Sequence, residues 1–325
     1  MHTLQDRFGR RFSYLRLSVT EVCNFRCQYC LPDGFKGSKR GFLTVPEIRR
    51  LVRAFAELGT FKVRLTGGEP TVRRDFDEIL AAVAETSGIE RVAMTTNAYR
   101  LAKNAAAWKS AGLDAVNVSL DALGAESFQR ITGDRRFAQV MAGIDQALAV
   151  GLDSVKINTV LLRELNDDQL PAFFDFVRHR PVSLRFIELM QTGDNRAYFE
   201  RHHVPGSGIR TRLENDGWQP VVRGPAAGPA VEYAHPDHAG RIGMIAPYAA
   251  HFCDDCNRLR VTARGALKLC LFGNGSSDLR TWLQHDDQTE ALKSHIMSAL
   301  FEKPPTHFLH QGRVGDTPHL ASTGG

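Results

Sequence analysis

Long hydrophobic runs are missing from this sequence, and so are the signals that direct a chain into or across a membrane. No apolar stretch approaches the about 20 residues that a transmembrane helix needs. Residues 1–11 are polar and charged and lack the apolar core of a secretory signal. With 43% hydrophobic and 24% charged residues, the composition is typical of a globular protein. We therefore expect no membrane association and a cytoplasmic location.

Charge of one sign is not concentrated anywhere along the chain. The formal net charge is only +5, and runs of Lys and Arg do not exceed pairs such as Arg73-Arg74 and Arg135-Arg136. Nucleic-acid binding normally shows as clusters of basic residues, so we expect no nucleic-acid partner. The sequence also lacks internal repeats and low-complexity tracts.

Cysteine is scarce, but its placement is informative. The six cysteines fall into two groups of three, one near each end of the chain. Disulfides are rare in a cytosolic chain of this length, where clustered cysteines more often bind metal or carry out redox chemistry. Metal binding is therefore the leading interpretation of both groups.

Strand-like and helix-like segments alternate from residue 15 to about 190, which predicts consecutive βα units and a parallel sheet. A capping box with an early proline, Thr44-Val45-Pro46-Glu47, predicts the first helix. The pattern fits either an open doubly wound sheet or an incomplete barrel, and both place ligands at the carboxyl ends of the strands. The six predicted strands are Leu15–Val19, Lys62–Leu65, Arg91–Thr95, Ala115–Ser119, Val155–Val160 and Ser183–Glu188.

The composition shifts towards Pro, Gly and Ala between Gln219 and Ala230, which indicates a linker or an irregular loop. We therefore divide the chain into a larger part, residues 1–218, and a C-terminal region, residues 219–325. Within the second part we expect a hairpin over Arg258–Leu271, turning near Gly265, and a final helix near Leu279–Phe301.

The first cysteine group, Cys23, Cys27 and Cys30, lies in the loop directly after the first predicted strand. A cubane iron–sulfur cluster normally takes four thiolates, so three ligands leave one iron open to bind another molecule. Structural zinc also needs four ligands, and the nearest histidine, His2, is distant in sequence. An iron–sulfur cluster is therefore favoured over zinc at this group.

The second group consists of Cys253, Cys256 and Cys270. Three cysteines again suggest a cluster with an open iron. Here zinc is a stronger rival, because His251 lies two residues before Cys253 and could complete a site of three cysteines and one histidine. Spacing alone leaves the two interpretations nearly even.

The first group has the spacing CxxxCxxC with Tyr29 just before its last cysteine, and Gly67-Gly68-Glu69-Pro70 follows the second predicted strand. Together these motifs resemble the radical S-adenosylmethionine (SAM) superfamily. The resemblance implies an incomplete (β/α)6 TIM-type barrel and a 4Fe-4S cluster whose open iron chelates SAM. In that superfamily SAM is cleaved reductively to a 5'-deoxyadenosyl radical, which abstracts a hydrogen atom from the substrate.

From Leu15 through Phe272 the chain resembles one family in particular, GTP 3',8-cyclase, the molybdenum-cofactor biosynthesis protein A family. This resemblance resolves the second cysteine group in favour of a second 4Fe-4S cluster. The motifs that carry it are Arg-Leu-Ser-Val-Thr before Cys23, Arg64-Leu-Thr-Gly-Gly-Glu-Pro, Thr95-Thr-Asn, Asn117-Val-Ser-Leu-Asp, Lys156-Ile-Asn, Arg185-Phe-Ile-Glu-Leu-Met190 and Phe-Cys-Asp-Asp-Cys-Asn-Arg-Leu-Arg.

Carried over by position, the family's ligand contacts fall on named residues of this chain. The resemblance implies SAM contacts from Tyr29, Gly68, Ser119 and Met190. It implies GTP contacts from Arg16, Arg64, Thr95, Lys156, Arg258, Leu259 and Arg260. The basic residues among them suit a triphosphate, since arginine can bind phosphate in bidentate fashion, and Arg258 and Arg260 share one face of an extended segment. The terminal pair Gly324-Gly325 matches a family tail that enters the active site.

The implied activity is the cyclisation of GTP to (8S)-3',8-cyclo-7,8-dihydroguanosine 5'-triphosphate, the first step of molybdenum-cofactor biosynthesis. The resemblance also implies a homodimer, an external one-electron reductant such as flavodoxin, and transfer of the product to cyclic pyranopterin monophosphate synthase. Two other interpretations are a radical SAM enzyme with an auxiliary cluster and a different substrate, and a regulatory or nucleic-acid-binding module that uses both cysteine groups as zinc sites.

Overall fold

The strands of the computed structural model, which describes residues 3–222, 224 and 227–324, are ordered β12-β11-β10-β1-β2-β3-β4-β5-β6-β9-β8-β7 in one sheet. Neighbouring strands from β1 to β6 pair in parallel. The strands are β1 (Tyr14–Thr20), β2 (Lys62–Gly67), β3 (Arg91–Thr96), β4 (Ala115–Ser119), β5 (Ser154–Leu161), β6 (Ser183–Glu188), β7 (Gln219–Pro220), β8 (Val231–Ala234), β9 (Arg241–Ile245), β10 (Arg258–Val261), β11 (Ala266–Lys268) and β12 (Ser277–Asp278).

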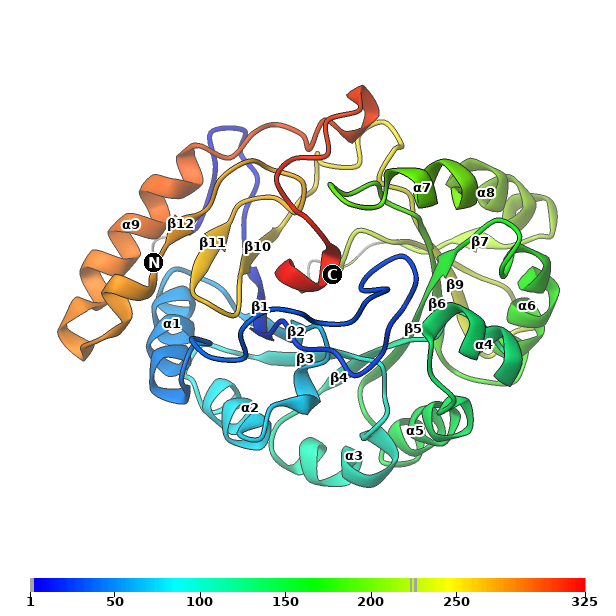
Figure 1. Ribbon diagram of the computed structural model, residues 1–325, viewed down its shortest axis with the longest axis horizontal. Coiled ribbons are helices and arrows are strands. Elements are labelled where there is room, and N and C mark those ends of the chain that lie inside the picture. Colours follow the sequence, from blue (N-terminus) through cyan, green and yellow to red (C-terminus); the bar gives the residue numbers. More distant parts are fainter. Residues whose placement is uncertain (1–2, 223, 225–226, 325) are drawn as a thin grey trace.

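Helices surround the curved sheet on its outer side, and the C-terminal end of the chain lies inside the curve (Figure 1). No helix in the described part of the chain is long and apolar enough to cross a membrane. The helices are α1 (Val45–Glu57), α2 (Phe76–Ala84), α3 (Leu101–Ser110), α4 (Ala125–Thr132), α5 (Phe137–Ala149), α6 (Leu170–Arg178), α7 (Arg196–His202), α8 (Gly206–Asn215) and α9 (Thr289–Phe301).

The predicted incomplete barrel is confirmed. All six predicted strands are present, and no end is displaced by more than two residues. Among the described residues the sheet does not close, because its order begins with β12 and ends with β7. The inner face of this open barrel is therefore available for a site, with the strand ends and the C-terminal segments around it.

Helix α1 forms where the capping box predicts it. The backbone N–H of Thr44 donates to Glu47 Oε2 at 2.7 Å, and the backbone N–H of Glu47 donates to Thr44 Oγ1 at 3.4 Å. Together these bonds satisfy N–H groups that a helix start leaves without intrahelical partners. The apolar stripe of the helix, Ile48, Leu51, Val52 and Phe55, is fully buried.

Residues 219–324 extend the sheet at both of its ends. Strand β10 pairs in parallel with β1, and β9 pairs in parallel with β6. The predicted hairpin is also present, since β10 and β11 are antiparallel and Gly265 takes a positive φ of 93° in the turn between them. A division of the chain after residue 218 stays a prediction, and strands from both parts share one sheet.

Two sequence expectations need correction. The final helix begins at Thr289, not near Leu279, and residues 280–283 and 286–288 form short 3-10 turns before it. The cause is a local cap, because the side chain of Gln288 accepts the backbone N–H groups of Gln284 and His285. The expected linker starts later than Gln219, since β7 pairs with β8, while residues 223, 225 and 226 lie outside the described residues.

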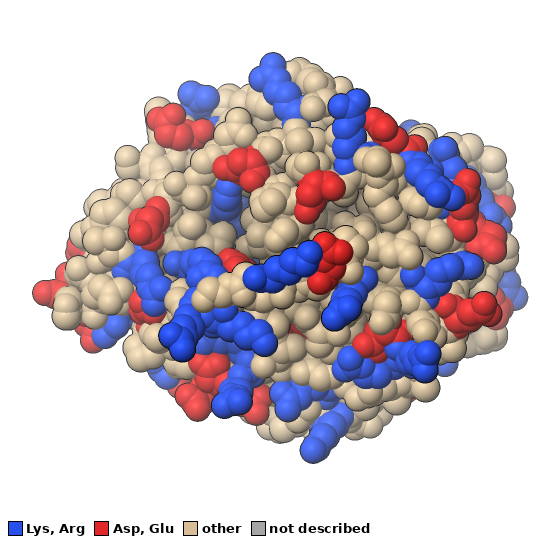
Figure 2. Space-filling model, in the orientation of Figure 1, with Lys and Arg blue, Asp and Glu red and all other residues tan. Residues whose placement is uncertain are grey.

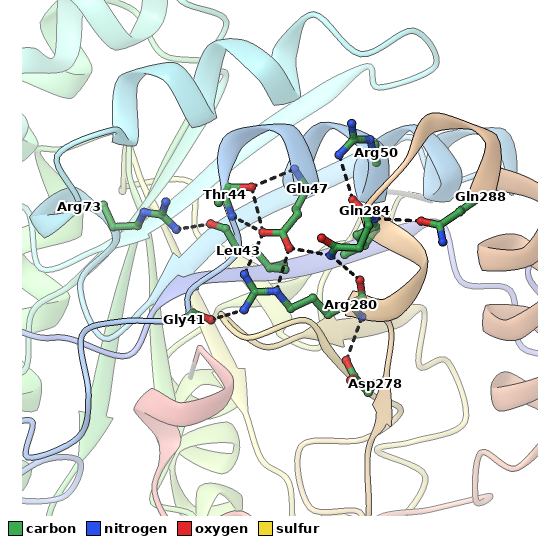
Figure 3. A network of polar contacts seen from close by, with 11 residues as sticks. Gly41, Leu43, Thr44, Glu47, Arg50, Arg73, Asp278, Arg280, Gln284 and Gln288 are labelled. Atoms are coloured by element: carbon green, nitrogen blue, oxygen red, sulfur yellow. Dashed lines mark hydrogen bonds and ion pairs between the residues drawn. The ribbon is translucent and has the colours of Figure 1, made fainter.

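A polar network joins α1 to the C-terminal region (Figure 3). Arg280 Nε donates to Glu47 Oε1 at 2.8 Å, and Gln284 Nε2 donates to the same oxygen at 3.1 Å. Burial would raise the pKa of Glu47, but these donors and Thr44 outweigh it and lower the pKa from 4.5 to about 2. Glu47 thus remains charged while it caps α1 and binds the segment before α9.

Candidate active site

One cavity of about 270 Å³ brings nearly all of the predicted site residues together. Its walls come from the inward-facing residues of β1 to β6, the loops that follow them and the C-terminal segments. Of the residues assigned from the sequence, the lining includes Arg16, Cys23, Cys27, Tyr29, Cys30, Arg64, Gly68, Thr95, Ser119, Lys156, Met190, Cys253, Cys256, Arg258, Arg260, Cys270 and Gly324.

The first cysteine loop is fixed by close backbone contact with the turn after β2. The N–H of Gly68 donates to Thr20 O at 3.0 Å, and the N–H of Glu69 donates to Val22 O at 2.9 Å. A Cβ atom on Gly68 would lie only 2.6 Å from Val22 O, so the glycine is required for this approach. Two distant sequence motifs therefore form one structural unit at the cavity.

Glu69 of the same motif points away from the cavity and is fully buried. Its carboxylate accepts the hydroxyl groups of Thr71 and Thr96 and the backbone N–H of Asn97. Asn97 Nδ2 in turn donates to Asn24 Oδ1 at 2.9 Å, inside the cysteine loop. The glutamate therefore ties the end of β3 to the cysteine loop.

Tyr29 is held in the cavity wall by a carboxylate that follows β4. Its hydroxyl donates to Asp121 Oδ2 at 2.9 Å, and Asp121 Oδ1 accepts the N–H of Val160 at 2.8 Å. Burial raises the pKa of Asp121 to about 6. Burial also raises the pKa of the Cys23 thiol to about 11 and that of Cys30 to about 12. The thiolate forms of both cysteines therefore need a bound group that stabilises their negative charge.

The other expected SAM residues lie at the carboxyl ends of β4 and β6, which flank β5 in the sheet. Ser119 is the last residue of β4, and Met190 lies two residues after β6. The loop at Met190 is closed by its own hydrogen bonds, since Asn195 Nδ2 donates to Met190 O at 3.0 Å and the N–H of Gln191 donates to Tyr248 Oη at 3.0 Å. Tyr29, Gly68, Ser119 and Met190 thus all line the same cavity.

The second cysteine group forms from two segments. Cys253 and Cys256 lie between β9 and β10, whereas Cys270 follows β11. Burial would raise the pKa of Cys256, but the nearby cations Arg258, Lys303 and Arg10 outweigh it and lower the pKa. Cys256 also lines a second, outer cavity of about 430 Å³.

His251, which could have completed a zinc site with the second cysteine group, lies outside the cavity. The side chain of His251 is 85% exposed and its Nδ1 contacts Asp254 Oδ2 at 2.8 Å, so it does not line the cavity. Within the described residues, no three His, Cys, Asp or Glu side chains are grouped as they would be around a single metal ion. Both sets supply three cysteines, the number that leaves one iron of a cluster open. The described cavity lining also contains one histidine, His307, whose buried Nε2 has no hydrogen-bond partner among the described residues.

Strand register places the basic residues in rows. Tyr14 of β1 lies beside Arg258 of β10 and Lys62 of β2. One step further, Arg16 lies beside Arg260 and Arg64. The described lining contains no Asp or Glu and eight basic residues, which are Arg16, Lys62, Arg64, Lys156, Arg185, Arg258, Arg260 and Lys303.

The cations of the cavity lower the pKa values of Tyr14 and Lys156, which lie among them. Burial would raise the pKa of Tyr14, but Arg64, Arg16 and Lys62 outweigh it and lower the pKa to about 6. The Tyr14 hydroxyl also accepts a hydrogen bond from Arg64 Nε. Burial, followed by the charge of Arg185, lowers the pKa of Lys156 to about 8. A cavity of this kind suits a polyanionic ligand.

The molecular surface has a different character. On the face shown in Figure 2, Lys and Arg side chains are interspersed with Asp and Glu. The cavity therefore differs from this surface in the composition of its charges, and not only in its shape.

Three buried oxygen atoms of the cavity wall have no hydrogen-bond partner among the described residues: Thr95 Oγ1, Asn117 Oδ1 and Asn158 Oδ1. A buried polar atom without a partner is costly, so these atoms point to ligand groups that donate hydrogen bonds. Thr95 and Asn117 lie side by side across β3 and β4.

Sequence reasoning missed several residues of the wall: Tyr14, Lys62, Asn117, Asn158, Arg185 and Lys303. Strand periodicity could have found some of them. Lys62 lies two residues before Arg64 and Asn158 two residues after Lys156, so each shares a face with an assigned residue. Lys303 carries no such signal, because it follows α9.

Leu259 is the one described residue among those assigned that does not line the cavity. It lies between Arg258 and Arg260 on β10, so alternation turns its side chain to the opposite face, where it packs in the hydrophobic core at 1% exposure. Its expected contact with GTP remains a prediction, and in this fold only its backbone could make one.

The C-terminal tail lines the cavity through Leu320, Ala321 and Gly324, and Figure 1 shows the end of the chain inside the curve of the sheet. The carbonyl of Gly324 accepts Arg16 Nη2 at 2.7 Å and Thr66 Oγ1 at 2.8 Å. Gly324 has a φ of 74°, and a Cβ atom there would lie 2.3 Å from Thr66 Cγ2. Glycine is therefore required at this position, while Gly325 lies outside the described residues.

Comparisons with known proteins agree with this arrangement. Residues 17–177 match the Radical SAM superfamily, which implies a 4Fe-4S cluster and SAM, and residues 182–309 match Molybdenum Cofactor Synthesis C. SuiB of Streptococcus suis bound to S-adenosylmethionine has a similar fold, with a TM-score of 0.66 at 14% identity over 92% of this chain and 68% of that one. A second structure of SuiB gives a TM-score of 0.64 at 13% identity over 94% of this chain and 69% of that one.

The likeness to one curated protein is much stronger. A GTP 3',8-cyclase from Vibrio vulnificus (strain CMCP6) is 54% identical over 324 residues, which cover 99% of this chain and 97% of that protein. A likeness of this degree runs through the barrel, both cysteine groups and the C-terminal region. The chain therefore belongs to the GTP 3',8-cyclase family of the Radical SAM superfamily.

Proposed function

We propose that this chain is a radical SAM enzyme that converts GTP to (8S)-3',8-cyclo-7,8-dihydroguanosine 5'-triphosphate, the first step of molybdenum-cofactor biosynthesis. The observation that carries the proposal is the meeting of two three-cysteine groups and eight basic residues in one cavity. A relative named GTP 3',8-cyclase, 54% identical over nearly the whole chain, supports the same substrate.

Each cysteine group would hold one 4Fe-4S cluster. Cys23, Cys27 and Cys30 would bind the cluster that faces SAM, with Tyr29 and Gly68 beside it. Cys253, Cys256 and Cys270 would bind the second cluster on the nucleotide side. When bound, these cofactors supply a one-electron reduction of SAM and a radical that takes a hydrogen atom from the substrate.

The protein's own residues would bind and orient the two nucleosides. The paired rows that contain Arg16, Arg64, Arg258 and Arg260 would neutralise the triphosphate, since arginine donates two parallel hydrogen bonds to phosphate oxygens. Lys156 would add a further charge, and Thr95 would accept a hydrogen bond from the nucleoside. The tail carbonyl of Gly324 would fix Arg16 in this array.

SAM would lie near the first cysteine loop, where Ser119 and Met190 complete the wall. Holding both nucleosides in one enclosed space positions the reacting atoms and excludes water from a reactive radical. No histidine is needed as a general base for this chemistry.

We also propose the wider setting that the family implies. The barrel of residues 1–218 and the C-terminal region of residues 219–325 would each hold one cluster. The enzyme would act in the cytoplasm as a homodimer, receive electrons from an external one-electron donor such as flavodoxin, and pass its product to cyclic pyranopterin monophosphate synthase.

An anaerobic assay tests the proposal. The protein, loaded with iron and sulfide, is incubated with GTP, SAM and a reductant, and the products are separated. We expect the cyclised triphosphate and 5'-deoxyadenosine in matching amounts, and neither product from the matched variant Cys27→Ala. Cleavage of SAM without any change in GTP would contradict the proposal and indicate another substrate for the same radical chemistry.

A further inference from the structure

Lys303 is a buried lysine at the second cysteine group that the proposed reaction does not use. It follows α9, is 3% exposed and lines the main cavity. Its ammonium group donates a hydrogen bond to the carbonyl of Leu269, the residue before Cys270. On another side, Nζ lies 5.2 Å from the centre of the Phe12 ring. The charge is therefore held beside the third cysteine of the group.

In the described part of the chain, no carboxylate forms an ion pair with Lys303. Arg10, another cation near this group, differs in having a carboxylate partner. It forms an ion pair with Asp6 at 2.7 Å while its Nη1 donates to Cys253 O at 3.2 Å. Burial of an unpaired ammonium is unfavourable unless an anion or several hydrogen bonds compensate. The partners of Lys303 given above are one carbonyl and one aromatic ring, neither of which carries a full negative charge.

The cysteines near Lys303 indicate which negative charge would compensate it. Cys253, Cys256 and Cys270 line the same cavity, and cysteines bind metal as thiolates. Three thiolates carry one more negative charge than an oxidised 4Fe-4S core carries positive charge, so the loaded site is anionic.

We propose that Lys303 is the fixed counter-charge of the iron–sulfur cluster held by Cys253, Cys256 and Cys270, and that it raises the reduction potential of this cluster. The inference rests on the proposed function only in taking the second cofactor to be a cluster. The physical reason is that reduction adds a negative charge, and a nearby buried cation stabilises the reduced state more than the oxidised one. Lys303 is thus a tuning residue and does not need to touch the substrate.

A purely structural role is the competing explanation. The hydrogen bond to Leu269 could serve only to attach the end of α9 to the hairpin. The two roles differ in what they require, since a structural role needs a hydrogen-bond donor of the right length, whereas a counter-charge needs a positive charge. Lys303→Met removes both the charge and the donor, Lys303→Arg keeps both, and Lys303→Gln keeps a donor without the charge. Lys303→Gln should therefore behave like Lys303→Met if the charge matters and like the parent if only the hydrogen bond does.

The test is a redox titration followed by electron paramagnetic resonance, on the full chain with both clusters loaded. The signal of the second cluster is identified in Cys27→Ala, which lacks the first. We expect Lys303→Met to shift the potential of the second cluster to more negative values and Lys303→Arg to return it close to the parent value. The first cluster should not shift, and neither should either cluster in the control Lys103→Met, which removes an exposed lysine of α3.

An unchanged potential in loaded Lys303→Met would overturn the inference, as would equal shifts in Lys303→Met and Lys303→Arg. If Lys303→Met loses iron from the second site, the iron content of Lys303→Arg decides. Retention by Lys303→Arg together with loss from Lys303→Gln supports the counter-charge, and loss from Lys303→Met and Lys303→Arg with equally lowered unfolding temperatures indicates a structural attachment.

The measurement uses no substrate, so it separates this inference from the proposed function. If the parent fails to cyclise GTP but the potential of the second cluster shifts in Lys303→Met, the proposed function alone is refuted. If the parent cyclises GTP but the potential does not shift in Lys303→Met, the inference alone is refuted.

Discussion

The two cysteine groups hold the same number of sulfurs in opposite electrostatic surroundings. Around the first group lie carboxylates: Asp121 contributes to raising the pKa of Cys27, and Glu69 contributes to raising that of Cys23, in both cases after burial. Around the second group lie cations, since Arg258, Lys303 and Arg10 lower the pKa of Cys256. The difference suits two different ligands, because SAM carries a positive sulfonium whereas GTP is a polyanion.

The groups also differ in how the chain builds them. Cys23, Cys27 and Cys30 come from one loop that the Gly67-Gly68 turn holds by backbone contact. The second group joins two segments, and Cys256 lines both the main cavity and the outer one. We infer that a site built from one loop serves the radical-forming step and that a site built from two segments serves the substrate.

The largest expected effect separates the two groups completely. Cys27→Ala should abolish SAM cleavage and leave iron at the second site, because each group has its own three ligands. Cys256→Ala should preserve SAM binding and eliminate the cyclised product. Iron content, 5'-deoxyadenosine and cyclised product are measured for both variants under anaerobic conditions.

The comparison would fail in either of two ways. Parental rates of 5'-deoxyadenosine formation by Cys27→Ala would mean that the first group does not hold the radical-forming cluster. Full product formation by Cys256→Ala with an iron-free second site, or stoichiometric zinc there in the parent, would remove the role of the second group.

The next effect concerns the cations on the nucleotide side. Arg260 is buried, lines the cavity and pairs in register with Arg16. One charge-assisted contact is worth about 1.5–3 kcal/mol, so Arg260→Ala should weaken GTP binding by about ten- to a hundredfold. SAM binding should change little, because its expected contacts lie at the other cysteine group. Binding of both ligands to the loaded protein is measured by calorimetry.

Arg74→Ala is a suitable control, since Arg74 is exposed and outside the cavity. It should affect neither ligand. An Arg260→Ala protein with parental GTP affinity would refute the phosphate contact. Equal losses for GTP and SAM would instead indicate a disturbed fold, for which the hydrogen bond from Arg260 to Thr323 O offers a route.

Much of the fold could be predicted from the sequence because its signals are local. The alternation of strands and helices gave all six central strands, and the capping residues Thr44 and Glu47 fixed the start of α1. The addition of β9 and β10 to opposite ends of the sheet was not predictable in the same way. That pairing depends on contacts between distant segments, which no local pattern records. The start of α9 was misjudged because the side chain of Gln288 caps the chain ahead of it.

The site residues likewise separate into those that local sequence patterns reveal and those that only the fold brings together. The cysteine groups and the paired glycines are visible because metal ligation and close backbone approach demand particular residues at fixed spacing. Lys62 could have been found, since it shares a strand face with Arg64. Arg185 was missed, because a basic residue in a strand without an assigned neighbour on its face gives no sign of whether it faces a cavity or solvent. Lys303 was missed because only the fold brings the residue after α9 to Cys270.

A third effect concerns the attachment between the two regions. Glu47→Gln would leave Arg280 without its ion pair and should lower the free energy of unfolding by about 2 kcal/mol at pH 7. The folded-state pKa of Glu47, about 2, lies below its ordinary value of 4.5, so its contribution is complete above pH 4.5 and is lost as the pH falls towards 2. Urea unfolding of parent and variant should therefore differ less at pH 4 than at pH 7.

Glu57→Gln is the matched control, since Glu57 also lies in α1 and pairs with Lys293 of α9 at 2.8 Å. Its side chain is 42% exposed, and such pairs contribute about 0.5 kcal/mol or less. Equal destabilisation by the two variants, or a constant difference between Glu47→Gln and the parent from pH 7 to pH 4, would contradict the role given to the buried network.

The smallest expected effect is a pH dependence confined to the nucleotide side. Lys156 lines the cavity, and burial together with Arg185 lowers its pKa to about 8. A polyanion binds the charged lysine more strongly than the neutral one, so GTP affinity should fall as the pH rises from 7 to 9. The loss should not exceed about tenfold, because about a tenth of the lysines are still charged one pH unit above a pKa of about 8. Lys156→Arg should remove most of this fall, since a guanidinium stays charged throughout the range.

Lys156→Met should bind GTP more weakly than the parent at pH 7, and its affinity should vary less with pH. A pH profile of Lys156→Met identical to that of the parent would show that another group is responsible. SAM affinity, measured on the same samples, should have no such step, because Lys156 lies among the cations and not at the first cysteine loop.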